Sequence, residues 1–177
     1  MRRLFATLTI VAAALGLSAP AHAQEIFTGL YAHGVDTPLS LDIGEEGMDV
    51  QAGYRFAEID ALGGMQPYIF ASANTEGYTS FVGAGVSWKA DLGDFYLRPG
   101  IGLVVHDGPE EVRDPDTQFR NDLGSRILFQ PEIALGFNVS ERVSIEASWI
   151  HISNANVFDR GQNPGIDMMG IRLNLSM

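Results

Sequence analysis

The chain has 177 residues, with 22 acidic side chains against 11 lysines and arginines, and it has no cysteine. This length suits a single domain, and without cysteine an exported fold is held together with no help from disulfides. The acidic balance argues against nucleic-acid binding, which requires a basic face.

The first 23 residues have the three parts of a secretory signal peptide. Two arginines form a basic start, residues 4–17 are apolar, and Ala21-His22-Ala23 matches the A-x-A cleavage pattern. The apolar stretch is shorter than a membrane-spanning helix requires. We expect a mature protein that begins at Gln24 and forms one domain over residues 24–177. Removal of two of the eleven basic residues leaves nine against 22 acidic ones.

After the signal peptide the polarity alternates from one residue to the next, which is the period of β-strands. In residues 95–106 and 127–138, one face is apolar and the other carries the charged, amide and glycine residues. A soluble β-sandwich would turn that second face to solvent and would rarely make it so rich in glycine. In an outer-membrane barrel it lines a narrow lumen, while the apolar face meets lipid. The sequence therefore predicts an all-β fold, an eight-stranded antiparallel transmembrane β-barrel of the bacterial outer membrane, with the soluble sandwich as the alternative.

Eight strands are expected, each suited to a tilted crossing of the bilayer. They lie at residues 25–33, 47–57, 66–74, 78–90, 94–106, 125–139, 142–154 and 167–177. The connections 37–47, 107–124 and 155–166 are long, whereas 90–93 and 139–142 are tight. Long loops outside and short turns inside are typical of such barrels, so we expect both termini in the periplasm.

A barrel of eight strands is filled by its own side chains, so a water-filled pore is not expected. Charges inside it need partners. We expect pairing among the inward-facing residues Arg55, Arg98, Glu132, Glu146 and Arg172. Function should then reside on the rim or on the outer wall.

Three polar residues interrupt the apolar outer face of the last two predicted strands. His151 and Ser153 share the outward face of strand 142–154. Side chains two residues apart on one face are roughly 6–7 Å apart, from which an imidazole can reach a hydroxyl as a general base reaches its nucleophile. Asp167 opens the neighbouring antiparallel strand on the same face, where a carboxylate can contact the second imidazole nitrogen. The alternative is that these are ordinary polar residues at the rim of the barrel, where a polar side chain costs little free energy.

The segment HISNANVFDRGQNPGID, residues 151–167, resembles the active-site segment of the outer-membrane lipid A 3-O-deacylase family (PagL type). Members carry His-x-Ser-Asn-Ala at the end of the seventh strand, then Asn-x-Gly-Ile and an acidic residue at the start of the eighth. The resemblance implies that Ser153 is the nucleophile, His151 the general base and Asp167 the orienting acid, where the family usually has glutamate.

The same segment offers donors for an oxyanion. The resemblance implies that Asn163 helps to bind it, with Asn154, Gly165 and nearby backbone amides as further candidates. No metal and no cofactor is required for this chemistry.

The resemblance implies a serine esterase that removes the ester-linked 3-hydroxyacyl chain at the 3-position of lipid A, at the extracellular leaflet of the outer membrane. Its partners would be lipopolysaccharide and the surrounding lipid, with no nucleic acid, and a homodimer is compatible with the sequence. Acyl chains would lie along the outer wall, where Ala147 leaves room beside Ile145, Trp149, Ile171 and Leu173. The alternatives are a non-enzymatic barrel with a structural or adhesive role, and an esterase that acts on phospholipid.

Overall fold

A computed structural model describes residues 24–38, 40, 44–108, 123–157 and 165–177. The expected signal peptide lies outside this part of the chain. The elements in chain order are β1 (Glu25–His33), β2 (Met48–Arg55), the 3₁₀ turn η1 (Asp60–Leu62), β3 (Met65–Asn74), β4 (Phe81–Trp88), β5 (Ala90–Leu92), β6 (Phe95–His106), β7 (Ile127–Asn138), β8 (Val143–Ile152) and β9 (Ile166–Ser176). No helix in the described residues is both long enough and apolar enough to cross a membrane.

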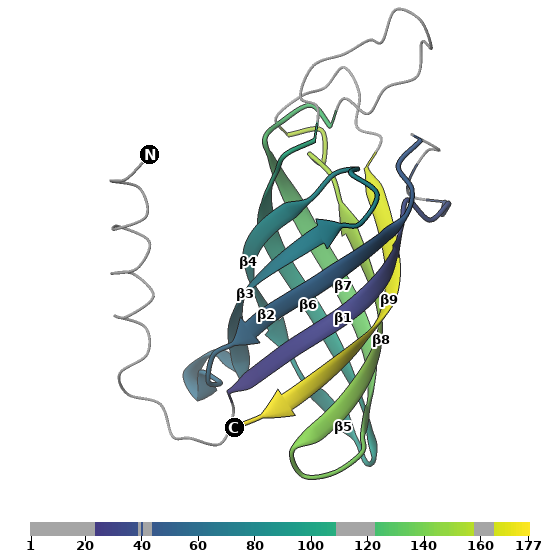
Figure 1. Cartoon of the computed structure of the whole chain (residues 1–177). Coiled ribbons are helices and arrows are strands. Elements are labelled where there is room, and N and C mark those ends of the chain that lie inside the picture. The colour runs from purple at the N-terminus through teal and green to yellow at the C-terminus, as the bar shows by residue number, and fades with distance from the viewer. Residues whose placement is uncertain (1–23, 39, 41–43, 109–122, 158–164) are drawn as a thin grey trace, which may run out of the picture.

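The strands form a closed antiparallel barrel (Figure 1). β1 pairs with both β2 and β9, and β4 closes the ring by pairing with both β3 and β6. β5 continues β4 along β6 in one register, because Ser87 lies opposite Gly100 and Ala90 lies opposite Leu97. The nine labelled strands are therefore eight barrel strands, and the predicted fold class is confirmed.

Most predicted boundaries agree with the structure to within three residues. β1 begins and ends where predicted, whereas the predicted strand 78–90 is divided at Lys89. The 3₁₀ turn η1 was not predicted from the sequence; it ends at Gly63, which adopts the left-handed conformation with φ 69°. The period-two pattern carries no signal for so short a turn.

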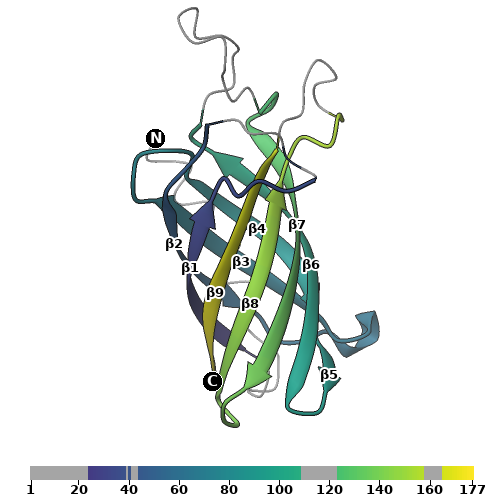
Figure 2. The ribbon, with the colours of Figure 1, turned by 90° about the vertical axis from the view of Figure 1, so that its right-hand side faces the viewer.

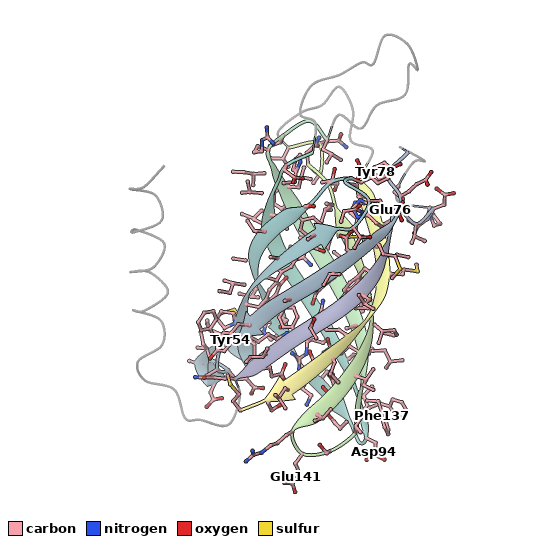
Figure 3. The ribbon with its side chains drawn as sticks, viewed as in Figure 1. Tyr54, Glu76, Tyr78, Asp94, Phe137 and Glu141 are labelled. Carbon is pink, nitrogen blue, oxygen red and sulfur yellow. The ribbon has the colours of Figure 1, made fainter. Side chains whose placement is uncertain are left out.

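The two ends of the barrel differ. β1, β3, β6 and β8 all end at one end of the barrel, here called the loop end because three of the four connections that follow them are long in sequence (Figures 1 and 2). The connections after β2, β5 and β7 and the C-terminus lie at the other end, here called the turn end. Figure 3 shows Glu76 and Tyr78 near the loop end, and Tyr54, Phe137 and Glu141 near the turn end.

Three buried arginines and three buried glutamates fill the interior near the turn end. Arg98 donates to Glu25 at 2.6 Å, and Arg172 donates to Glu132 at 3.2 Å. Glu146 lies within 3.2 Å of all three guanidinium groups. The predicted interior pairing is thus present, and Glu25 joins it.

The inward glycines make room for aromatic rings. A Cβ at Gly136 would lie 2.0 Å from Cζ of Tyr96, so any side chain there would overlap the ring. This close approach explains why glycine is frequent on the lumen-facing side of the strands.

Candidate active site

His151 and Asp167 meet across two neighbouring strands. β8 and β9 are antiparallel, and their register places these two residues directly opposite each other. Imidazole Nδ1 lies 2.7 Å from Asp167 Oδ1. The contact fixes which ring nitrogen faces the acid, and it leaves Nε2 directed elsewhere.

The carboxylate of Asp167 is completely buried and is held on both oxygens. Oδ1 also accepts a hydrogen bond from Trp149 Nε1 at 3.0 Å, and Oδ2 accepts one from the hydroxyl of Thr37. Trp149 was expected on this face but without a polar role, and Thr37 was not among the predicted site residues. Trp149 could have been found, because it precedes His151 by two residues on one face, whereas the loop residue Thr37 carries no such signal.

Ser153 continues the register of β8 just beyond the end of the strand. Its backbone exchanges two hydrogen bonds with Phe129, at 3.1 and 2.8 Å, in line with the β7–β8 pairs further down. The register therefore keeps Ser153 on the same face as His151. The described residues show no hydrogen bond between Ser153 Oγ and the imidazole, and catalytic hydrogen bonds are often long until substrate is bound.

Gly165 lies against the other edge of the imidazole. A Cβ at this position would lie 2.6 Å from Cε1 and 3.2 Å from Nε2 of His151, and the residue has φ +68°. Only glycine meets both conditions without strain. Gly165 thus adjoins the nitrogen that faces away from Asp167.

Asn154 is buried and shapes the turn that follows Ser153. Its Nδ2 donates to the carbonyl of Leu123 at 3.0 Å, and its Oδ1 accepts from the backbone N–H of Asn156 at 2.7 Å. Ala155 and Asn156 both adopt the left-handed conformation, with φ 53° and 56°, which is disfavoured for alanine. The Asn154 side chain therefore holds a strained turn in place, while Asn163, also predicted at this site, lies outside the described residues.

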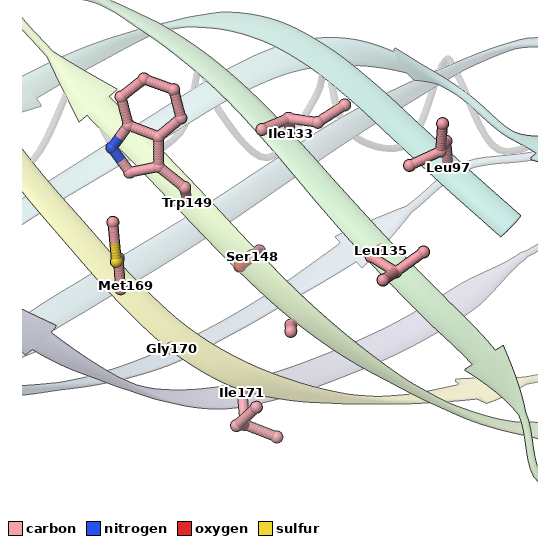
Figure 4. Close-up of a pocket in the computed structure, with 9 residues that line it drawn as sticks. Leu97, Ile133, Leu135, Ser148, Trp149, Met169, Gly170 and Ile171 are labelled. Atoms are coloured by element: carbon pink, nitrogen blue, oxygen red, sulfur yellow. The ribbon is translucent and has the colours of Figure 1, made fainter. Parts of the chain in front are cut away.

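A shallow apolar groove of about 510 Å³ lies on the same outer wall (Figure 4). It is lined by Leu97, Ile133, Leu135, Ala147, Ser148, Trp149, Met169, Gly170 and Ile171. Three residues of the predicted acyl surface, Ala147, Trp149 and Ile171, are in it. Ile145 and Leu173, also predicted, do not line it; they lie opposite each other one outward position further toward the turn end.

These features define a class of protein. A closed barrel with an apolar exterior and a charged, filled interior is the fold of outer-membrane barrels. A histidine held by a buried carboxylate, with a serine two residues further along the same face, resembles part of the arrangement found in serine hydrolases.

Residues 47–176 match the model of the family described as Lipid A 3-O-deacylase (PagL), and the chain belongs to this family. The match confirms the resemblance found in the sequence and accords with a place in the outer membrane. No curated protein matches the chain.

Solved structures share the barrel. The crystal structure of the outer-membrane enzyme PagL has a TM-score of 0.62 at 15% identity, with 86% of this chain and 99% of that chain covered. The N-terminal β-barrel domain of Pseudomonas aeruginosa OprF gives 0.54 at 7%, covering 86% and 96%. Neisserial surface protein A gives 0.51 at 9%, covering 87% and 97%. At such identities the likeness shows the fold alone.

Proposed function

We propose that this protein is a serine esterase that removes the ester-linked 3-hydroxyacyl chain at the 3-position of lipid A. The observation that carries the proposal is the 2.7 Å contact between Nδ1 of His151 and Oδ1 of Asp167. Ser153 follows His151 by two residues on the same outward face, and the barrel belongs to the lipid A 3-O-deacylase family.

The reaction follows from the placement of the three groups. Asp167 accepts the Nδ1–H of His151, so Nε2 is the nitrogen that takes the proton from Ser153 Oγ. The alkoxide attacks the ester carbonyl, the sugar hydroxyl leaves with the proton from Nε2, and an acyl-enzyme forms. Water then releases the 3-hydroxy fatty acid. Asp167 stabilises the imidazolium in both steps.

The oxyanion requires donors near Nε2 of His151. Gly165 adjoins this nitrogen, so its backbone N–H is one candidate, and Asn163, which lies outside the described residues, is the candidate that the family resemblance implies. Asn154 acts mainly through the turn that it holds, because its Nδ2 already donates to Leu123. One barrel carries the whole triad, so a homodimer is not required for the chemistry.

The substrate's acyl chain would lie in the apolar groove. Trp149 lines the groove and is the next outward residue of β8 before His151, so a chain in the groove leads to the triad. Lipid A occupies the outer leaflet, so we place the loop end outside the cell and both termini in the periplasm.

Mass spectrometry of lipid A from cells that express the protein tests the proposal. We expect loss of one 3-hydroxyacyl chain with the wild type and no loss with Ser153→Ala or His151→Ala. Ser125→Ala is the matched control, because this serine also lies at the loop end and its hydroxyl accepts a hydrogen bond from the backbone N–H of Ile127 at 3.1 Å. Unchanged lipid A from a folded wild-type barrel would contradict the proposal, and fatty-acid release from phospholipid vesicles alone would assign a different substrate.

A further inference from the structure

Asp167, the acid of the proposed triad, accepts further hydrogen bonds besides the one from His151. Its Oδ1 accepts from His151 and from Trp149, and its Oδ2 accepts from Thr37. Two of these donors, His151 and Trp149, come from β8, the strand that pairs with β9, and Thr37 comes from the connection after β1. None of these donors is adjacent to Asp167 in the sequence, and the hydroxyl of Ser40, from the same connection as Thr37, also interacts with the carboxylate.

Thr37 reaches Asp167 because the connection after β1 crosses the start of β9. β1 pairs with β9 up to His33 opposite Met168, and the backbone N–H of Val35 then donates to the carbonyl of Asp167 at 2.9 Å. The connection passes directly beside the acid, and Thr37 follows two residues later.

The far end of this connection is also anchored. Glu45 is buried, and its Oε2 lies 2.9 Å from both His33 Nε2 and the backbone N–H of Thr79. The backbone of His33 also donates to Gly47 at 3.0 Å. Thr37 therefore belongs to a segment that is fixed to the barrel on both sides.

We propose that Thr37 and Trp149 are positioning residues that hold the Asp167 carboxylate in the one rotation that serves His151. The proposal rests on the proposed esterase function. An aspartate carboxylate rotates easily about its last bond, because that torsion has broad minima. Donors on both oxygens remove this freedom, so Oδ1 stays directed at Nδ1 and the imidazole stays in one orientation.

The test compares kinetic constants of the full barrel in detergent micelles. Thr37→Val removes the hydroxyl at nearly constant volume, and we expect kcat to fall about tenfold, as for a lost hydrogen bond to a charged group, with KM unchanged. Thr37→Ser restores the donor and should restore kcat. Trp149→Phe keeps a ring in the groove but removes the indole N–H, and it should lower kcat in the same way.

The control is Thr75→Val. Thr75 also lies at the loop end, and its hydroxyl donates to the backbone carbonyl of Met48 on β2 at 2.9 Å. Thr75→Val should leave kcat unchanged. The melting temperature of this variant shows how much stability is lost when a threonine hydroxyl is removed at the loop end. Wild-type kcat in Thr37→Val, or an equal loss in Thr37→Ser, would overturn the proposal.

A second readout separates this inference from the proposed function. In protein labelled with ¹⁵N at histidine, the Nδ1–H of His151 should give a resonance typical of a proton shared with a carboxylate, and Thr37→Val should shift or broaden it. If the wild type does not hydrolyse lipid A, the esterase function fails, yet the resonance still decides the positioning role. A resonance that Thr37→Val leaves unchanged would refute that role whatever the activity.

Discussion

The imidazole of His151 is confined on two edges. Asp167 holds Nδ1, and the backbone of Gly165 lies against Cε1 and Nε2. The residue at position 165 must both adopt a positive φ and lack a Cβ, and these requirements have separate consequences. The positive φ allows the connection to enter β9. The absence of a Cβ leaves room for the imidazole of His151 in its observed position.

Gly165→Ala should therefore abolish most activity while the barrel still folds. The added Cβ would meet the ring at 2.6 Å, and a displacement of about 1 Å at a catalytic group lowers rates roughly 100-fold. Steady-state hydrolysis of lipid A measures the effect.

Gly63→Ala provides the matched control for that change. Gly63 has φ +69°, nearly equal to that of Gly165, but nothing lies within 4 Å of its Cβ position. Both variants share the backbone cost of about 1–2 kcal/mol, so only the ring contact differs between them. Equal activity in the two variants would show that Gly165 does not constrain His151.

The sequence could predict the His151–Asp167 contact but not the complete environment of Asp167. Strand parity and antiparallel pairing bring these two residues together, because both rules act over a few residues. The parity also suggested an outward, lipid-facing acid, whereas Asp167 is fully buried. Part of this environment is Thr37 on the connection after β1, whose path depends on loop conformation and has no periodic signal.

At the scale of elements, the groove arises from one small residue in a row of large ones. Along the outward face of β8, Ala147 stands between Ile145 and Trp149, and its cross-strand neighbours are Leu135 and Ile171. The depression is thus a property of four strands, and the sequence located it because Ala147 interrupts the row. The sequence did not predict that Ile145 and Leu173 lie outside the groove lining, because the extent of the groove depends on how several strands pack together.

Ala147→Leu should fill the groove and lower kcat/KM for lipid A roughly tenfold or more, since a few methylenes decide whether a chain fits an apolar pocket. Hydrolysis of a short acetyl ester should be unaffected, because its acyl group does not extend into the groove. Ala84→Leu is the control, since Ala84 also lies between large outward residues, Ile69 and Leu103, but on the β4 side of the barrel. Equal losses on the long and short esters would argue against an acyl groove at Ala147.

At the scale of the whole molecule, the charged residues that stabilise the interior and the residues of the proposed active site lie in different parts of the barrel. The charged cluster around Glu146 lies inside and near the turn end, while His151, Ser153 and Asp167 lie outside and near the loop end. Charges within a barrel are stabilising only as a paired set, because removal of one partner leaves another buried and uncompensated. The interior therefore cannot vary freely, whereas the outer wall can carry a site without disturbing the fold.

The proposed orientation of the barrel is open to a direct test, because the chain has no cysteine of its own. Glu76→Cys places a thiol at the loop end and Glu141→Cys places one at the turn end, both on exposed residues (Figure 3). A maleimide that cannot cross the outer membrane should label the first variant in intact cells. It should label the second only after the membrane is permeabilised, because tight turns face the periplasm in such barrels. The reverse pattern would place the triad at the inner leaflet, where lipopolysaccharide is not the surrounding lipid, and would remove lipid A as the substrate.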